Sequence, residues 1–394
     1  MTPAARIGAA IEILDQVLAG AAAEQVLTSW ARSSRFAGSG DRAAIRDHVF
    51  DALRCLRSFT ALSGAREPSG RALMIGALLA SGDDPKALFS GEGHAPAGLS
   101  ADEQTLLAAA PAPEDLELLV ALDCPDWLAP ALRRSLGDDL PAVMTAMRER
   151  APVFLRVNAA RGTLAEAQAA LAEDNIPTRP HPLAAFALEV TGNARRIKNA
   201  SAYCDGVVEL QDASPQAAVE ALPLRPGMRV LDYCAGGGGK SLAMAARVQG
   251  HFVAHDAAPQ RMRDLPERAR RAKARIDVKT PDGLRGKMFD LVVLDVPCSG
   301  SGTWRRQPDA KWTLTPERLD QLTRLQSDIL DAALAYTAPG GAIAYMTCSL
   351  LDTENQSRIA AFLSHHPDWR LSGDRLFTPL EGGDGFYSAL LTRI

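Results

Sequence analysis

The stretch from residue 228 to residue 241 reads MRVLDYCAGGGGKS. It opens with an apolar run typical of a buried strand, and four consecutive glycines, Gly236 to Gly239, follow almost at once. Glycines let the backbone approach a ligand closely, and the first N–H groups of a following helix attract a carboxylate or a phosphate. Ligands of open α/β sheets bind beyond the carboxyl ends of the strands. The stretch therefore predicts the ligand loop of a doubly wound α/β domain.

Three interpretations of this loop compete. Its ending resembles a nucleotide-binding P-loop, but the pattern GxxxxGK[ST] requires a glycine at the position of Cys234. The second interpretation is a pocket for S-adenosylmethionine (SAM), whose amino-acid end the glycines would receive. The third is a tight turn between a strand and a helix. The failed spacing disfavours the P-loop and leaves the other two open.

The rest of the C-terminal half alternates strands and helices. Strands are expected at HFVAHD (251–256), FDLVVLD (289–295) and GAIAYMT (341–347), and an amphipathic helix is expected at 316–336. Apolar strands separated by helices are typical of a parallel sheet that is covered on both faces. The pattern predicts a doubly wound domain over residues 201–394.

The first half of the chain has a different character. Apolar residues at helical spacing, broken by Gly/Pro-rich segments, predict an all-helical bundle over residues 1–140. Residues 141–200 combine the candidate strands PVFLRVN (152–158) and FALEV (186–190) with a candidate helix between them. This pattern predicts a small α+β module. No convergent cluster of reactive residues occurs in the helical part, so we expect it to supply no chemistry.

Length and composition limit the class of protein. The 394 residues exceed one ordinary domain, and 47% hydrophobic with 23% charged residues is typical of a globular chain. No apolar run is long enough to cross a membrane, and Asp15 interrupts the first apolar stretch, so we expect a cytoplasmic protein. The six cysteines form no CxxC pair, which favours reduced thiols and no metal site. A net charge of −4 neither requires nor excludes RNA.

Two acidic residues follow later strands of the α/β half. Asp256 ends the second strand, about 20 positions beyond the glycines, where a carboxylate can bind ribose hydroxyls. Asp282 follows a weak strand and could accept a hydrogen bond from an adenine amino group. A Pro-Asp-Gly turn explains Asp282 equally well.

Two cysteines follow two further strands. Cys298 lies in the segment Asp-Val-Pro-Cys after Asp295, and Cys348 directly follows Thr347. A single buried cysteine is usually an inert small side chain. Two at matching strand ends, beside the glycine loop, indicate chemistry instead.

Methylation of a cytosine at carbon 5 needs such a thiol. Carbon 5 is a poor nucleophile until a thiolate adds to carbon 6 and turns the ring into an enamine. A free cysteine has a pKa of about 8.5, so its surroundings must activate it. Asp295 is placed to assist the addition by a hydrogen bond to the ring nitrogen.

At this point the chain resembles a known family. The segments CAGGGGKS, DVPCSGSGTWRRQPDAKW and TCSLLDTENQ are similar to the family patterns CAAPGGKT, DxPCSGxG, RRxPDxKW and TCSxxxxEN of Sun/RsmB-type ribosomal RNA cytosine-5 methyltransferases. The order is also that of the family. The resemblance covers 201–394 strongly and 1–200 weakly. It departs at Gly236-Gly237, where the family has Ala-Pro, at Ser241, where it has Thr, and at Gln356, where Glu is common.

The resemblance implies a fold, an activity and roles for residues. The fold is a doubly wound, Rossmann-like SAM-dependent methyltransferase domain (201–394), preceded by a NusB-like helical RNA-binding domain (1–140) and a small RNA-contacting α+β module (141–200). The activity is SAM-dependent methylation of cytosine, on small-subunit ribosomal RNA. The implied catalytic residues are Cys348 as nucleophile, Cys298 in product release and Asp295 between cofactor and base. The implied SAM site consists of Cys234, Ala235, Gly236, Gly237, Gly238, Gly239, Lys240, Asp256, Asp282 and Asp295.

RNA contacts are expected just after the first cysteine. Arg305, Arg306 and Lys311 follow the Cys298 loop, with Trp304 and Trp312 nearby. Guanidinium groups can bind phosphates, and an indole can stack on a base. A second basic run, 261–279, fits a solvated helix face as well as an RNA surface.

Other functions compete with this interpretation. A methyltransferase of the same fold could act on a protein or small molecule, but transfer to nitrogen or oxygen needs no thiol pair. A non-catalytic RNA-binding ribosome assembly factor would not need the two cysteines and the cofactor acids. We expect an RNA partner, no membrane, no metal and a monomer.

Overall fold

A computed structural model describes all residues, 1–394, and divides the chain into two compact units. Unit 1 consists of residues 1–150 and 304–313, and unit 2 consists of residues 151–303 and 314–394. The structure thus differs from the expected division at 140 and 200. The small α+β module and the large sheet belong to one unit, and ten residues after the Cys298 loop belong to the helical one.

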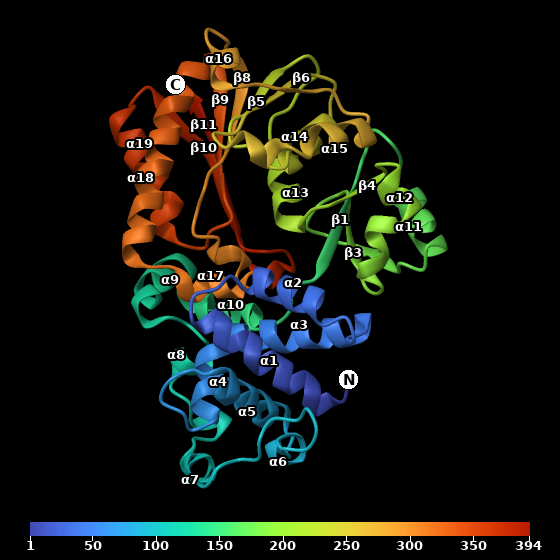
Figure 1. Cartoon of the computed structure of the whole chain (residues 1–394). Helices are drawn as coiled ribbons and strands as arrows, with labels where there is room; N and C mark the ends of the chain where they lie inside the picture. Colours follow the sequence, from blue (N-terminus) through green and yellow to red (C-terminus); the bar gives the residue numbers. More distant parts are fainter. The chain divides into compact units, whose positions relative to one another are not determined.

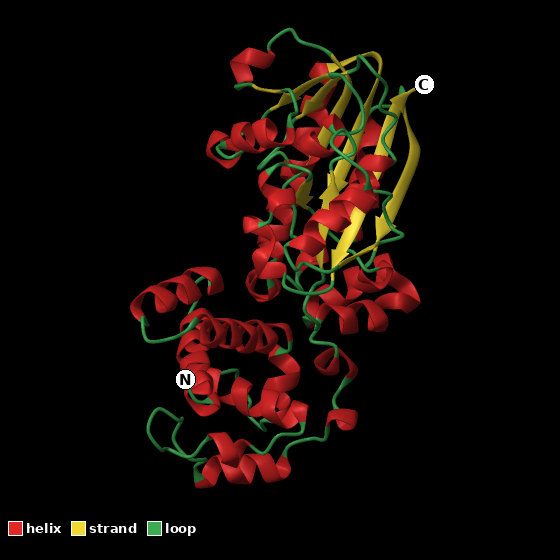
Figure 2. Cartoon of the chain, turned by 90° about the vertical axis from the view of Figure 1, so that its right-hand side faces the viewer, coloured by secondary structure: helices red, strands yellow, loops and turns green.

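Unit 1 is entirely helical, as Figure 2 shows. Its core contains apolar side chains at helical spacing from the first helices, such as Ile7, Leu14, Ile45 and Val49. The main helices are α1 (Pro3–Leu18), α2 (Ala23–Ser33), α3 (Ser39–Arg54), α4 (Leu56–Leu62), α5 (Gly70–Ser81), α6 (Pro85–Leu88), α7 (Ala101–Ala109), α8 (Leu118–Ala121), α9 (Ala129–Leu136), α10 (Leu140–Met147) and α17 (Pro308–Thr313).

The segment 304–313 packs in unit 1 at the C-terminal end of α3. Lys311 Nζ donates to the carbonyl of Arg54 at 3.1 Å, and Trp312 Nε1 donates to the carbonyl of Leu53 at 2.7 Å. The last carbonyls of a helix have no partner within the helix, so these two side chains satisfy them. Arg54 Nε in return donates to the carbonyl of Arg305 at 2.8 Å.

Unit 2 begins with a small antiparallel sheet of order β2-β3-β1-β4. Its helix α11 (Leu164–Glu173) buries Ala167 and Leu171 against the sheet. The fourth strand lies beyond residue 200, which is why the expected boundary there does not separate two bodies. The strands are β1 (Val153–Val157), β2 (Thr178–Pro180), β3 (Ala187–Val190) and β4 (Val208–Leu210).

The large sheet has seven strands in the order β10-β11-β9-β8-β5-β6-β7. The five strands from β9 to β7 pair in parallel, whereas β11 pairs antiparallel with β9 and β10. The strands are β5 (Arg229–Asp232), β6 (His251–Ala254), β7 (Ile276–Val278), β8 (Phe289–Asp295), β9 (Thr337–Thr347), β10 (Trp369–Phe377) and β11 (Phe386–Arg393).

Both faces of the large sheet are buried, which confirms the doubly wound architecture. Along β8, Leu291 and Val293 pack in one core, while Val292 and Leu294 pack in another. Successive strand residues point to opposite faces, so a continuous apolar run requires cover on both sides. In Figure 1, α14 and α15 lie on one side of the strands and α18 and α19 on the other. These helices are α14 (Gly239–Ala245), α15 (Leu265–Ala272), α18 (Pro316–Ala333) and α19 (Gln356–His365). Helix α13 (Ala213–Glu220) packs in the same core as α14.

No helix of the structure is both long and apolar enough to cross a membrane.

A close approach of two backbones fixes the end of the Cys298 loop. Gly302 N donates to the carbonyl of Cys348 at 2.9 Å, and Gly385 N donates to the carbonyl of Gly302 at 2.9 Å. A Cβ placed on Gly302 would lie 2.0 Å from the Gly385 oxygen. Only glycine lets these segments come so near.

We predict that Gly302→Ala lowers the free energy of unfolding by about 1–3 kcal/mol, because the added methyl group overpacks two backbones. The measurement is urea unfolding of the full chain. Gly373→Ala in β10 is the matched control, since a Cβ there meets nothing within 4 Å. Equal stability of the two variants would contradict the close approach.

Candidate active site

The glycine loop links β5 to α14 and needs glycine at two positions. Gly236 and Gly238 have φ values of +50° and +77°, in the left-handed region that glycine adopts without strain. A Cβ on Gly238 would also lie 2.2 Å from a Leu265 methyl group. Ala235 N donates to the carbonyl of His255 at 2.8 Å, which ties the loop to the end of β6.

Asp256 lies against this loop, as the sequence predicts. Its side chain is buried, and its Oδ2 accepts from Gly236 N at 2.9 Å and from Arg261 at 3.2 Å. Its Oδ1 accepts from Ala258 N at 2.9 Å. A carboxylate offers about four acceptor positions. One position therefore stays available for a hydroxyl donor.

Lys240 and Asp295 form an ion pair across the strand ends. Lys240 Nζ lies 2.5 Å from Asp295 Oδ2, and the lysine side chain is largely buried. Burial lowers the pKa of Lys240, but the charge and hydrogen bond of Asp295 outweigh it and raise the pKa. Lys240 is therefore held in its charged form beside the loop.

Asp232 is a buried carboxyl at the end of β5. Ser241 Oγ donates to its Oδ2 at 2.6 Å, whereas Oδ1 is buried without a hydrogen-bond partner. Burial raises the pKa of Asp232 to about 6. The charged form is thus disfavoured in the folded chain.

The two cysteines of the strand ends are in contact. Asp295 in β8 is the register partner of Met346 in β9, and Cys298 Sγ lies 3.3 Å from Cys348 Sγ. The contact with Cys348 and burial together raise the pKa of Cys298 well above its ordinary value. Cys298 is therefore protonated at neutral pH.

Cys234 lies near the same acids but has a different character. Burial and the carboxylates of Asp232, Asp295 and Asp256 raise the pKa of its thiol. A thiol in this setting is a packing residue rather than a nucleophile.

Comparison with known proteins places this geometry in a family. The family model described as 16S rRNA methyltransferase RsmB/F matches residues 219–391, and a ferredoxin-like domain model of RsmF/B-like methyltransferases matches residues 124–195. The chain belongs to the RsmB/F methyltransferase family. The second match includes the first three strands of the small sheet.

Two relatives of this RsmB/F-family chain carry the same name. Proteins named ribosomal RNA small subunit methyltransferase B are 34% identical over 285 residues in Vibrio cholerae and 36% identical over 284 residues in Cronobacter sakazakii. Each match covers 68% of this chain and 65% or 66% of the relative. The chain thus spans slightly less than two thirds of the length of these relatives.

Solved structures show the same fold. The crystal structure of PH0851 has a TM-score of 0.77 at 23% identity and covers 100% of this chain and 99% of that chain. NSun6 from Pyrococcus horikoshii, solved with SFG, has a TM-score of 0.59 at 16% identity and covers 68% of this chain and 98% of that chain.

Four further residues of the expected site are one exposed acid of unit 2 and three basic residues of unit 1. Asp282 is exposed beyond β7 and pairs with Arg285 at 3.0 Å. Lys311 and Arg305 are buried in unit 1, and Arg306, half-buried, belongs to the same unit. The burial argues against direct contact of Lys311 and Arg305 with RNA phosphates, because each would have to leave its packed position.

Sequence reasoning missed two buried groups at the site. Arg156, from β1, donates to the Gly239 carbonyl at 3.0 Å and to Gln211. Burial lowers its pKa to about 10. The arginine inside the apolar run PVFLRVN is a signal that could have found it. The second group is Glu354, between the two cysteine loops.

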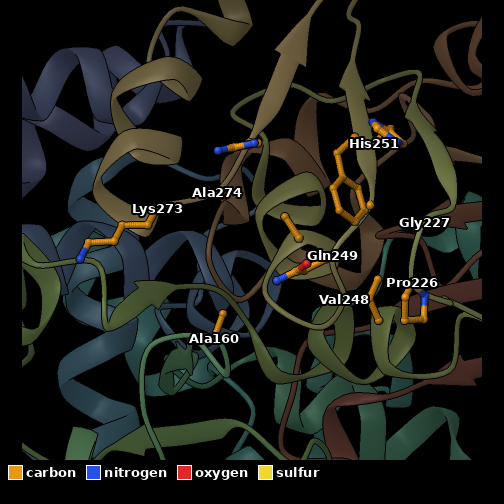
Figure 3. A pocket seen from close by; sticks show the side chains of 12 residues that line it. Ala160, Pro226, Gly227, Val248, Gln249, His251, Lys273 and Ala274 are labelled. Atoms are coloured by element: carbon orange, nitrogen blue, oxygen red, sulfur yellow. The ribbon is translucent and has the colours of Figure 1, made fainter.

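A pocket of about 680 Å³, seen in Figure 3, lies at the edge of the large sheet where the parallel strands begin. The candidate site lies at the other edge, where these strands end. The lining of the pocket includes Gly227, His251 and Ala274, which precede or begin strands rather than end them. The pocket contains none of the expected site residues, so it does not enlarge the candidate site.

We predict that Asp232→Asn removes a pH dependence of stability. The folded pKa is raised to about 6 from an ordinary 3.8, so the folded chain holds this proton to higher pH than the unfolded chain. Stability of the parent chain relative to the variant should fall as pH rises from 4 to 6 and then level off, by up to about 3 kcal/mol. Urea unfolding of both proteins between pH 4 and 7.5 measures the difference. A constant difference over this range would contradict the prediction.

Proposed function

We propose that this chain is a SAM-dependent RNA cytosine-5 methyltransferase that acts on small-subunit ribosomal RNA through a covalent cysteine–cytosine adduct. The observation that carries the proposal is the contact of the Cys298 and Cys348 sulfurs at 3.3 Å, at the ends of adjacent strands beside a charged Lys240–Asp295 pair. Methyl transfer to a nitrogen or oxygen atom needs no thiol. Methyl transfer to carbon 5 of cytosine can use both thiols, one for addition to the ring and one for release.

The residues present fit SAM. Gly236 and Gly238 form a cradle that side chains would fill, and the free acceptor position of Asp256 suits a ribose hydroxyl. Cys234, Ala235, Gly237, Gly239 and Lys240 complete the loop that would hold the amino-acid end. Asp282, exposed near the end of β7, remains the candidate for the adenine side. When bound, SAM supplies the electrophilic methyl group that the activated carbon 5 accepts.

The thiols divide the work. The family resemblance assigns to Cys348 the thiolate that adds to carbon 6 and forms the sulfur–carbon bond. Asp295 lies at the end of the neighbouring strand, where its carboxyl, when it carries a proton, would donate a hydrogen bond to the ring nitrogen and favour addition. After transfer, a base such as water takes the carbon 5 proton, and the electron pair of that C–H bond re-forms the ring double bond and expels the Cys348 thiolate from carbon 6. Cys298, in contact with that sulfur, assists this release.

The substrate class comes from the relatives. Both are named ribosomal RNA small subunit methyltransferase B, so we infer the same RNA here and action in the cytoplasm. Unit 1 would add RNA affinity as a NusB-like domain. Single-stranded targets are favoured, since flipping a paired base costs a few kcal/mol.

We predict that Asp256→Ala weakens SAM binding more than about tenfold, because charge-assisted hydrogen bonds in a partly dry site contribute about 1.5–3 kcal/mol. Calorimetry with SAM measures the dissociation constant, and circular dichroism checks that the variant is folded. Asp277→Ala, an exposed acid in β7, is the control and should bind normally. An unchanged constant for Asp256→Ala would remove this residue from the cofactor site.

We predict opposite fates for the two thiol variants. With SAM and ribosomal RNA from cells that lack this protein, Cys348→Ala should give neither adduct nor methylated RNA. Cys298→Ala should accumulate a protein–RNA adduct that survives a denaturing gel and disappears on RNase digestion. Cys204→Ala, which changes an exposed thiol of the same unit, should behave as the parent chain.

Two results would contradict this assignment. An adduct with Cys348→Ala and none with Cys298→Ala would exchange the roles of the thiols. Full methylation by both variants, with no adduct, would exclude the covalent mechanism.

A further inference from the structure

A buried carboxylate lies between the two cysteine loops and takes no part in the proposed chemistry. Glu354 is 0% exposed and lies in the turn between β9 and α19. Burying a carboxylate is costly unless hydrogen bonds compensate for the lost water. The hydrogen-bond partners of Glu354 therefore indicate its structural role.

Every acceptor position of Glu354 is occupied. Oε1 accepts from Ser299 N at 2.8 Å and from Gln326 Nε2 at 2.9 Å. Oε2 accepts from the hydroxyls of Ser299 and Ser349, each at 2.5 Å. These four bonds use the full capacity of a carboxylate.

The partners are the chain neighbours of the two thiols. Ser299 directly follows Cys298, and Ser349 directly follows Cys348. Gln326 also donates to the carbonyl of Pro297, on the other side of Cys298, at 2.9 Å. Glu354 thus joins the backbones that carry both sulfurs.

The two loops are further connected through hydroxyls. Ser301 Oγ lies 2.9 Å from Ser349 Oγ and accepts from Leu350 N at 2.8 Å. Because the Ser349 hydroxyl proton goes to Glu354, Ser301 is left as the donor of the pair. The direction of this chain of bonds is therefore set by the carboxylate.

Glu354 is itself held firmly to β9. Its carbonyl accepts from the Tyr345 hydroxyl at 2.6 Å. The next residue, Asn355, accepts from Thr347 Oγ1 at 2.6 Å and donates to the Ser349 carbonyl at 2.9 Å. The turn, the strand end and both loops form one hydrogen-bonded body.

We propose that Glu354 is a positioning residue that sets the separation of the Cys298 and Cys348 sulfurs. What this separation means for the release of methylated RNA from Cys348 rests on the proposed function. Cys348 directly follows β9, whereas Cys298 lies three residues beyond the end of β8, and the bonds from Ser299 to Glu354 hold the chain right beside it. Loss of Glu354 should therefore displace Cys298 more than Cys348 and impair release more than attack.

Glu354→Gln tests the role of the carboxylate with little change in shape. The amide keeps one acceptor oxygen, but its NH₂ group donates where the carboxylate accepted, so the Ser299 and Ser349 hydroxyls would have to turn and accept. The hydroxyl bonds then lose the charge of the carboxylate and reverse their direction, which weakens the connection between the two loops. Asp352→Asn is the matched control, because Asp352 lies in the same turn and its carboxylate accepts from Ser357 rather than from a cysteine loop.

The first readout follows the reaction on ribosomal RNA from cells that lack this protein, with SAM in excess. Glu354→Gln should lower turnover about 10–100-fold and accumulate the covalent RNA adduct, while SAM affinity stays unchanged. Asp352→Asn should release free product like the parent chain. A merely structural defect would lower adduct and product together. Adding Ser299→Ala and Ser349→Ala to Glu354→Gln should have little further effect, since all act through one network.

The second readout measures the sulfur separation without the reaction. Diamide oxidises neighbouring thiols by taking up two protons and two electrons as they form a disulfide. Mass spectrometry of the peptides gives the rate for the pair Cys298–Cys348. We expect a slower rate in Glu354→Gln than in the parent chain and in Asp352→Asn.

The outcomes separate the two proposals. Normal turnover without adduct, or an unchanged disulfide rate, in a folded Glu354→Gln variant overturns the positioning role and leaves the proposed function intact. A parent chain that methylates no RNA overturns the proposed function, and the disulfide rates then decide the positioning role alone.

Discussion

The parallel register between β8 and β9 is the constraint on which the site depends. It makes Asp295 and Met346 partners, so the residues that follow them leave the sheet at the same edge. Both strands are buried on both faces, and a slip of one residue would exchange the two apolar sets. The register is therefore fixed by the core, and the meeting of Cys298 with Cys348 follows from it.

Around that edge, the fold balances several acids, each by a different means. Asp295 is balanced by the charge of Lys240, and Asp256 by backbone N–H groups and Arg261. Glu354 is balanced by four neutral donors. Asp232 has only Ser241 and a raised pKa.

The sequence predicted the parts of this arrangement that depend on local pattern. Apolar runs predicted the strands, the glycines predicted the loop, and both cysteines were placed at neighbouring strand ends. It could not show that Lys311 caps α3, because a basic residue in a loop looks the same whether it faces solvent or another helix. The role of Glu354 was equally hidden, since its partners are 55, 28 and 5 positions away along the chain. Hydrophobic periodicity carries no information about such side-chain bonds.

The chain connections explain why the Cys298 loop needs support of its own. After Cys298 the chain runs only as far as Thr303 before it enters unit 1 at Trp304, and it returns to unit 2 at Leu314. One end of the loop is thus held by a central strand and the other by a different body. Only five residues, 299–303, separate the Cys298 thiol from the segment that packs in unit 1. The bonds from Ser299 to Glu354 and from Gly302 to Cys348 lie within these five residues and tie them to the turn after β9 and to the end of β9.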